Sequence, residues 1–276
     1  MASGASARCL THCTPTGRND AEDQYAQKQN CRRTACTRGD QFDPGPRAIE
    51  LIAEAGFDFV IIDMEHVLIN PETVENMIRV AESYDLTPLV RVADLNPKTL
   101  LRLLDGGAQG IVLPMIESPE QLADAIAACK YHPLGRRSLN AGRPGSFGKH
   151  SLAQYVEAAN QQIMVVAMIE SAEGVRRAAE IASVPGLDMI LEGAADLSQS
   201  LGMPWQIDQS DVQNALFATW QATHAAGVAY CAIPRQPGDA ARWQARGVNT
   251  FVLGDERGIA FRALQARLAQ HSAEGK

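Results

Sequence analysis

The sequence predicts an α/β fold, a (β/α)8 TIM barrel, for residues 45–276. Helical patterns alternate strictly with short apolar runs, which is typical of parallel strands joined by right-handed crossovers. The length of 276 residues suits one barrel of about 250 residues with an additional segment. The alternative is a doubly wound open sheet. Neither G-x-G-x-x-G nor G-x4-G-K-S/T follows any predicted strand, which argues against its nucleotide-binding form.

The elements repeat one unit, a helix that ends near glycine followed by a β-branched strand. The first helix, residues 46–55, ends at Gly56, which suits a left-handed cap. The second helix, residues 71–84, begins with Asn70-Pro71, a cap residue followed by proline at the first helical position. Seven strands are expected at residues 57–62, 88–92, 110–116, 163–169, 189–191, 228–233 and 250–253.

The remaining helices are placed by the same signals. Gly106-Gly107 closes a helix over residues 97–105, and Ser118-Pro-Glu-Gln121 opens another as a capping box. Further helices are expected at residues 172–182, 211–225, 238–246 and 259–270. With seven strands visible, a closed barrel needs one more strand ahead of residue 46.

The first 44 residues do not fit this pattern. Residues 1–40 carry six Lys/Arg and four Asp/Glu, with few large apolar residues and no periodicity, a composition typical of disorder. We hypothesise that the chain up to about Asp43 is translated out of frame, because a shifted reading of the codons leading into Pro44 permits the strand-like Ile-Asn-Ser-Ile. Two regions are therefore expected: 1–44, disordered or out of frame, and the barrel domain 45–276.

Composition argues against several classes of function. The formal net charge is −7, so a nucleic-acid partner is not expected, because phosphate backbones attract basic surfaces. No apolar run reaches about 18 residues, the length that a membrane-spanning helix needs. No apolar secretory segment is visible at the N-terminus. We therefore expect a cytoplasmic protein that does not bind membranes.

Charged side chains end or follow most of the predicted strands. In barrels of this kind the active site lies at the carboxyl ends of the strands, so these side chains are expected to converge on one rim. The set contains carboxylates, one histidine and two arginines: Asp63, Glu65, His66, Arg91, Glu117, Glu170, Glu192, Asp196, Asp255, Glu256 and Arg257.

This ring of carboxylates predicts a divalent metal site. Unpaired carboxylates repel one another, a cation relieves the repulsion, and oxygen ligands favour Mg²⁺ or Mn²⁺ over Zn²⁺. Such a metal chelates a 2-oxo acid and stabilises the charge that develops on its keto oxygen. Arg91 would donate to that oxygen, and His66 would transfer protons near neutral pH. No strand ends in lysine, which argues against a Schiff-base aldolase.

Each of these residues also has a structural interpretation. Asp63 and Glu65 are compatible with helix N-caps, His66 with a structural histidine, and Arg91 with an ion pair. Glu117 is interpreted as the start of its helix. The convergence of several groups, rather than any single residue, predicts an active site.

At these residues the chain resembles the HpcH/HpaI aldolase family of metal-dependent 2-oxo-acid aldolases, whose fold is a phosphoenolpyruvate/pyruvate-type barrel. The resemblance covers residues 46–268, and its most specific segments are GFDFVIIDMEH at 56–66, PLVRV at 88–92, VLPM at 112–115, Ile169-Glu170 and GAADLS at 193–198. It implies that Glu170 and Asp196 are metal ligands and that His66 and Asp63 form an acid–base pair. The implied substrate contacts are Arg91, Gly193, Ala194 and Ala195.

Two departures from the aldolase pattern point to a subgroup. Met168 stands where these aldolases often have glutamine, and Glu192 begins a segment that is usually apolar-Gly-Pro. Residues 139–145, 191–200 and 252–262 are similar to the citrate synthases of staphyloferrin B-type siderophore pathways. That similarity implies condensation of acetyl-CoA with oxaloacetate to citrate. The family resemblance also implies a homo-oligomer with exchanged C-terminal helices. The candidates for contacts to CoA phosphates are Arg136, Arg137, Arg143 and Arg257.

Two other functions remain open. One is a class II aldolase that cleaves or forms 4-hydroxy-2-oxo acids through a pyruvate enolate. The other is a non-catalytic barrel that acts in assembly or regulation. Dependence on a thioester separates the citrate synthase from the aldolase. Loss of activity on substitution of Glu170 separates both enzymes from the non-catalytic protein.

Overall fold

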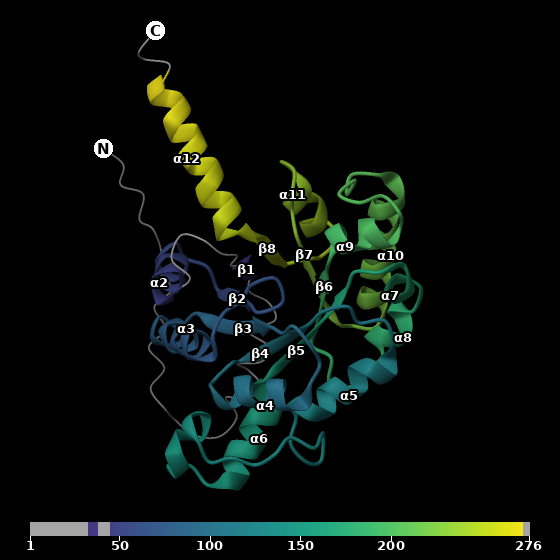
Figure 1. Cartoon of the computed structure of the whole chain (residues 1–276). Helices are drawn as coiled ribbons and strands as arrows, with labels where there is room; N and C mark the ends of the chain where they lie inside the picture. Colours follow the sequence, from purple (N-terminus) through teal and green to yellow (C-terminus); the bar gives the residue numbers. More distant parts are fainter. Residues whose placement is uncertain (1–32, 38–44, 273–276) are drawn as a thin grey trace, which may run out of the picture. The chain divides into compact units, whose positions relative to one another are not determined.

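Seven parallel strands, β2 to β8, form one curved sheet that is flanked by helices (Figure 1). This computed structural model describes residues 33–37 and 45–272. Neighbouring strands pair in parallel and in chain order, which confirms the predicted α/β class. The strands are β1 Arg33–Thr37, β2 Phe59–Asp63, β3 Thr87–Arg91, β4 Gly110–Leu113, β5 Met164–Ile169, β6 Met189–Glu192, β7 Ala229–Ala232 and β8 Thr250–Asp255.

Strand β1 lies within the region for which disorder or a shifted frame is expected. Its backbone pairs with β2 at Cys36 and Val60, and with β8 at Ala35 and Val252, so the strand order runs from β1 to β8 and returns to β1. Ladder hydrogen bonds use backbone groups alone. A segment without a strand pattern can therefore occupy a position between two strand edges. Residues 1–32 and 38–44 lie outside the described residues, so the frame hypothesis and the boundary at residue 44 stay predictions.

The helices begin at local capping signals. The side chains of Asn70, Asn96 and Ser118 accept hydrogen bonds from backbone N–H groups in the first turns of the helices they precede. Arg177 separates α7 from α8, where a single helix is predicted. The helices are α2 Pro46–Glu54, α3 Pro71–Ser83, α4 Pro97–Asp105, α5 Pro119–Cys129, α6 Leu152–Gln162, α7 Ala172–Arg176, α8 Ala178–Ala182, α9 Ala194–Ser200, α10 Ser210–Ala225, α11 Asp239–Gln244 and α12 Glu256–Ser272, with a 3₁₀ segment η1 at Arg143–Gly148.

Two α-helices, α6 and α9, were not predicted from the sequence. Helix α6 begins with a full capping box between Ser151 and Gln154, a signal that was available in the sequence. Helix α9 follows Gly193 without a side-chain cap, so nothing local marked its start. At the predicted capping box of α5, the Gln121 side chain accepts from the N–H of Glu117 rather than from that of Ser118.

Side chains alternate between two apolar layers along each strand. The inner layer is a cluster inside the curved sheet that includes Ile61, Leu89, Met168 and Leu191. The outer layer packs the opposite face of the sheet against the helices and includes Val60, Val90 and Ile190. Because strand side chains have a period of two, the inward positions that follow the inner layer at the carboxyl ends are Asp63, Arg91, Glu170 and Gly193.

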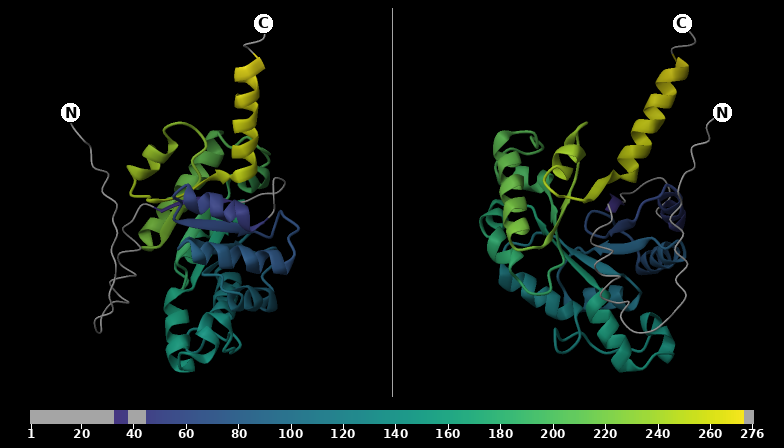
Figure 2. Two further views of the ribbon diagram at one scale, coloured as in Figure 1. Left: turned by 90° about the vertical axis from the view of Figure 1, so that its left-hand side faces the viewer. Right: turned by 180° about the vertical axis from the view of Figure 1, so that it is seen from behind.

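Helix α12 extends away from the sheet (Figures 1 and 2). Large apolar side chains are exposed along it: Ile259, Phe261, Leu264 and Leu268. Seventeen residues span about 25 Å at 1.5 Å per residue, so α12 presents a long, partly apolar surface. Among the described residues, no helix combines the length and the apolar character needed to cross a membrane.

Candidate active site

Arg91 and Asp63 form a fixed pair at the rim. They end neighbouring strands β3 and β2 and are register partners. Arg91 donates from Nε to Asp63 Oδ1 at 2.9 Å and from Nη2 to Oδ2 at 2.6 Å, a bidentate geometry that fixes the guanidinium plane. Burial opposes the Arg91 charge, but the hydrogen bond and the charge of Asp63 outweigh burial and raise the pKa of Arg91. Arg91 is therefore a permanent cation.

Glu65 and His66 complete the loop after β2. Glu65 Oε2 lies 3.2 Å from Arg91 Nη1 and 3.9 Å from His66 Nε2. Burial raises the pKa of Glu65, with further contributions from the carboxylates of Asp63 and Asp196, while Arg91 and His66 oppose the shift. The His66 side chain is 57% exposed. The backbone N–H of His66 donates to Asp63 Oδ1 at 3.4 Å, so this contact between the two residues of the predicted acid–base pair uses the main chain of His66 and not its imidazole.

Glu170 is a buried carboxyl group at the end of β5. It follows β5 directly, is 2% exposed, and accepts a hydrogen bond at Oε1 from the backbone N–H of Met115 at 2.8 Å. Met115 has a φ of 49°, a left-handed conformation that strains non-glycine residues and is concentrated at functional sites. A Cβ atom added to Gly193 would lie 2.4 Å from Glu170 Oε2. Only glycine therefore fits beside this carboxyl group.

The electrostatics around Glu170 favour an additional cation. Burial raises the pKa of Glu170 to about 7, the Met115 hydrogen bond opposes the shift, and the carboxylates of Glu65 and Asp196 add to it. Arg91 also lowers this pKa, but not enough to restore the ordinary value of 4.5. The carboxylates near Glu170 therefore leave negative charge that the Arg91 guanidinium does not neutralise.

Glu170 and Asp196 are suited to hold a divalent cation. Asp196 is exposed in the first turn of α9, and its charge acts on both Glu170 and Glu65. In the described part of the chain, no group of three His, Cys, Asp or Glu side chains could hold a metal ion. Two carboxylates would leave positions for water and a chelating substrate, as Mg²⁺ commonly requires. The donor set therefore fits a metal that is completed by its substrate.

Comparison with known proteins identifies the family. Residues 44–260 match the HpcH/HpaI aldolase/citrate lyase family. The chain belongs to this family. It is 32% identical over 228 residues to a hydroxypyruvate/pyruvate aldolase from Delftia acidovorans, which covers 83% of this chain and 85% of the relative. A 4-hydroxy-2-oxo-heptane-1,7-dioate aldolase from Salmonella dublin is 31% identical over 225 residues, 82% of this chain and 86% of the relative.

Solved structures of the HpcH/HpaI family agree with this assignment. The crystal structure of the citrate synthase SbnG is 42% identical, with a TM-score of 0.84, and the match covers 91% of this chain and 98% of that one. An HpcH/HpaI family protein from Burkholderia cenocepacia is 28% identical, with a TM-score of 0.83, over 90% and 99% of the two chains. The predicted resemblance is confirmed, and the protein is a carbon–carbon lyase or synthase of this family.

The remaining predicted substrate contacts lie at the start of α9 in this HpcH/HpaI protein. Gly193 packs against Glu170. Ala194 is buried in an apolar cluster with Val212 and Leu216 of α10, and Ala195 is half-buried. Their part in substrate binding stays a prediction. Glu192, by contrast, faces the outer layer, where its carboxylate accepts hydrogen bonds from Arg235 at 2.6 Å and Tyr230 at 3.3 Å.

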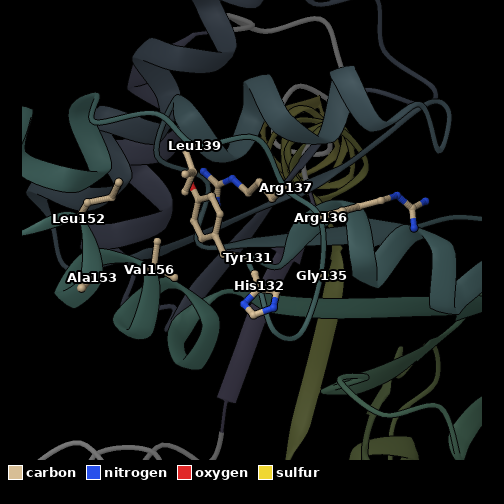
Figure 3. Close-up of a pocket in the computed structure, with 9 residues that line it drawn as sticks. All are labelled: Tyr131, His132, Gly135, Arg136, Arg137, Leu139, Leu152, Ala153 and Val156. Atoms are coloured by element: carbon tan, nitrogen blue, oxygen red, sulfur yellow. The ribbon is translucent and has the colours of Figure 1, made fainter.

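Three arginines considered for CoA phosphates lie at the opposite face. Arg137 donates to Asp105 at 2.7 Å, the last residue of α4, whose end lies at the amino ends of the strands because barrel helices run antiparallel to the strands. Arg143 pairs with Glu82 near the end of α3, and Arg136 with Asp124 at 3.1 Å. A pocket of about 480 Å³ opens beside them. Figure 3 shows Arg137 against the Tyr131 ring and Arg136 extending away from it.

Two determinants of the site were missed by sequence reasoning. The Met115 N–H that orients Glu170 is a backbone group 55 residues away, and no side-chain pattern signals it. The close packing of Gly193 against Glu170 was not predicted either, although a glycine directly after a strand is a signal of close backbone approach.

Arg257, the fourth arginine that was a candidate for CoA phosphates, lies at the carboxyl end of β8, with Nε 3.7 Å from Asp255 Oδ1.

Proposed function

We propose that this protein condenses acetyl-CoA with oxaloacetate to form citrate for siderophore assembly, on a complete (β/α)8 barrel of the phosphoenolpyruvate/pyruvate type. The observation that supports this proposal best is the buried Glu170, whose pKa is raised to about 7 beside Asp196 and Arg91. A carboxyl group so placed suits a site completed by a cation and an anionic 2-oxo acid. The likeness to the citrate synthase SbnG at 42% identity favours oxaloacetate and a thioester as the two substrates.

Glu170 and Asp196 are the proposed ligands of Mg²⁺ or Mn²⁺. When bound, the cation supplies Lewis acidity that polarises the keto group of the 2-oxo acid. Arg91, held in one plane by Asp63, donates to the same keto oxygen and stabilises the negative charge that develops on it. Gly193, Ala194 and Ala195 are the proposed substrate contacts at the start of α9, through their main chain, because none of them carries a bulky side chain.

His66, supported by Asp63, is the proposed acid–base group. It removes a methyl proton from acetyl-CoA, and the resulting enolate carbon attacks the keto carbon of oxaloacetate. A carbon–carbon bond forms, and the keto oxygen becomes an alkoxide that takes up a proton. Water then cleaves the thioester, so that citrate and free CoA leave. The exposed His66 ring, with Nε2 3.9 Å from Glu65 Oε2, is accessible to substrate for these two proton transfers.

Release of CoA from acetyl-CoA and oxaloacetate tests the proposal. We expect EDTA to abolish release, Mg²⁺ to restore it, and the product to be citrate. Glu170→Gln should lose this activity while remaining folded, and Glu157→Gln, at an exposed position on α6, is the matched control. A folded wild-type protein that releases no CoA in the presence of Mg²⁺ would reject the condensation.

A second candidate is a class II aldolase that uses pyruvate. It is favoured by the names of the relatives at 31–32% identity, which are aldolases for hydroxypyruvate, pyruvate and a 4-hydroxy-2-oxo acid. The same arginine and carboxylates would then stabilise a pyruvate enolate. Metal-dependent turnover of pyruvate with an aldehyde, without any thioester, would establish this function. If neither reaction occurs in folded protein, and Glu170→Gln changes nothing, the non-catalytic barrel is favoured.

Assembly and location are part of the same proposal. The exposed apolar side chains of α12 suit a homo-oligomer in which this helix packs against a second copy. We propose a cytoplasmic enzyme whose partners are small molecules, with neither nucleic acid nor membrane as a partner. The net charge of −7 supports the first exclusion.

A further inference from the structure

A pocket of about 270 Å³ lies between α10 and α11, outside the catalytic site. Its lining combines two aromatic rings, two guanidinium groups and two side-chain amides, from Phe217, Trp243, Arg242, Arg246, Gln213 and Asn214. None of these residues has a role in the proposed chemistry. The combination is nevertheless suited to a nucleotide, because purine rings stack on aromatic faces and phosphates bind arginine.

Arg246 is the central cation of this pocket. Its guanidinium carbon lies 4.9 Å from the ring centre of Phe217 and 5.1 Å from that of Trp243, so the two rings face a common space. Within the described residues Arg246 forms no ion pair with a carboxylate, whereas Arg242 pairs with Asp239. In an acidic chain, the Arg246 guanidinium, which is not neutralised by a carboxylate among the described residues, leaves a local positive charge that suits an anionic ligand.

The aromatic rings of the pocket belong to a larger stack. Phe217 stacks on Trp220 with centroids 5.2 Å apart, and Trp243 lies 6.4 Å from Trp220 and 5.4 Å from Tyr230. Trp243 is buried. These contacts support the rings from behind, so the aromatic walls are preorganised for a planar ligand.

This pocket is linked to the catalytic site by direct contacts. Tyr230, against Trp243, donates a hydrogen bond to Glu192 at 3.3 Å. The next residue, Gly193, packs against Glu170. Gln213 and Phe217 belong to the first two turns of α10, which begins at the catalytic face because barrel helices run antiparallel to the strands. A flexible arm that starts in the pocket therefore has a short path over the rim to Glu170.

We infer that this pocket holds the nucleotide end of coenzyme A, with the pantetheine arm crossing the rim toward Glu170. This inference rests on the proposed condensation. The adenine ring replaces the Arg246 guanidinium between Phe217 and Trp243, the phosphates pair with Arg246 and Arg242, and the amides of Gln213 and Asn214 bond the base. The site thus supplies the CoA contacts that the arginines at the opposite face do not.

Two thioesters that differ in the nucleotide test this inference. Arg246→Gln and Phe217→Ala should each raise the KM for acetyl-CoA roughly tenfold, the size expected for one charge-assisted contact. The KM for oxaloacetate and the KM for acetyl-pantetheine, which lacks the nucleotide, should stay at the wild-type values. Arg176→Gln is the control for loss of one surface arginine, because Arg176 is exposed on α7 and does not line the pocket. An unchanged KM for acetyl-CoA in both variants overturns the inference.

A binding measurement separates this site from the reaction. The chain has three tryptophans, and Trp205→Phe removes the exposed one, leaving Trp220 and Trp243 beside the pocket. Adenosine 3′,5′-bisphosphate should quench their fluorescence in the Trp205→Phe protein and fail to do so after Arg246→Gln. If the bisphosphate quenches the fluorescence but the protein releases no CoA from acetyl-CoA and oxaloacetate, the nucleotide site is supported and the condensation is rejected. Absence of quenching in the Trp205→Phe protein would reject the nucleotide site.

Discussion

Replacing Glu170 with glutamine should stabilise the metal-free protein while it removes activity. Burial and the nearby carboxylates raise the pKa of Glu170 from 4.5 to about 7. One pKa unit corresponds to 1.36 kcal/mol, so the ionised carboxylate destabilises the fold by roughly 3 kcal/mol as an upper value. Glutamine is neutral and keeps an oxygen that accepts the Met115 N–H. The variant therefore loses the penalty and retains the hydrogen bond.

The size of this stabilisation depends on pH. A raised carboxyl pKa means that the fold favours the protonated acid, so the stabilising contribution is present below the unfolded pKa of about 4.5 and is lost as pH rises through about 7. The advantage of Glu170→Gln over the wild type should grow by roughly 2–3 kcal/mol between pH 5 and pH 8. For a chain of this size that is about 5–10 °C in Tm.

Thermal unfolding in EDTA at the two pH values measures this difference. Glu157→Gln on the surface of α6 should show no growth of the difference with pH. Adding Mg²⁺ at pH 8 should stabilise the wild type and leave Glu170→Gln unchanged, because only the wild type has both metal ligands. A Glu170→Gln protein that is no more stable than the wild type at pH 8 would refute the electrostatic argument, and with it the reason for a cation at this site.

Three further predictions concern Arg91, Gly193 and α12. Arg91→Lys loses the bidentate contact to Asp63 and should lower kcat about 10²-fold or more, with an unchanged circular dichroism spectrum; near-wild-type kcat would remove Arg91 from the chemistry. Gly193→Ala places a methyl group 2.4 Å from Glu170 Oε2 and should weaken Mg²⁺ binding measured by calorimetry and cost about 1–3 kcal/mol of stability; unchanged Mg²⁺ affinity would show that the Glu170 carboxyl adapts. Leu264→Asp with Leu268→Asp, at exposed apolar positions of α12, should lower the mass measured by light scattering to that of one chain; an unaltered mass would exclude α12 from the interface.

The strand ends of the site were predictable because two simple rules act together. Asp63, Arg91 and Glu170 each continue the inward period of their strand, and parallel strands bring their carboxyl ends to one rim. Both rules need only local sequence. The contact between Met115 and Glu170 was not predictable, because it joins two loops through a backbone group whose direction depends on a left-handed φ.

Helix direction explains the arginines considered for CoA. The sequence shows Arg136, Arg137 and Arg143 close to conspicuous motifs, but it does not by itself display which end of the barrel they reach. Their pairing with residues near the ends of α3 and α4 places Arg137 and Arg143 at the amino ends of the strands. The pocket between α10 and α11 was not predicted from the sequence either. Its residues are spread over two helices whose facing surfaces are set by packing.

Strand β1 shows how far barrel architecture depends on tertiary context. The composition of residues 1–44 predicts disorder or a shifted frame, which stays a prediction; within this region the backbone of Arg33–Thr37 pairs with β2 and β8. Strand edges on both sides present unpaired N–H and C=O groups to any extended segment. Local pattern therefore has less influence at this position than at β2 to β8, where buried apolar side chains fix the register.

The hydrogen bond from the Met115 N–H to Glu170 does not depend on the side chain at position 115. Glu170 is oriented by a main-chain N–H, and no side-chain substitution at position 115 other than proline deletes that donor. The side chain of Met115 is 43% exposed and stands beside the carboxyl group without holding it. Position 115 is thus a place where side chains can be exchanged while the main-chain hydrogen bond that orients the Glu170 carboxyl group is retained.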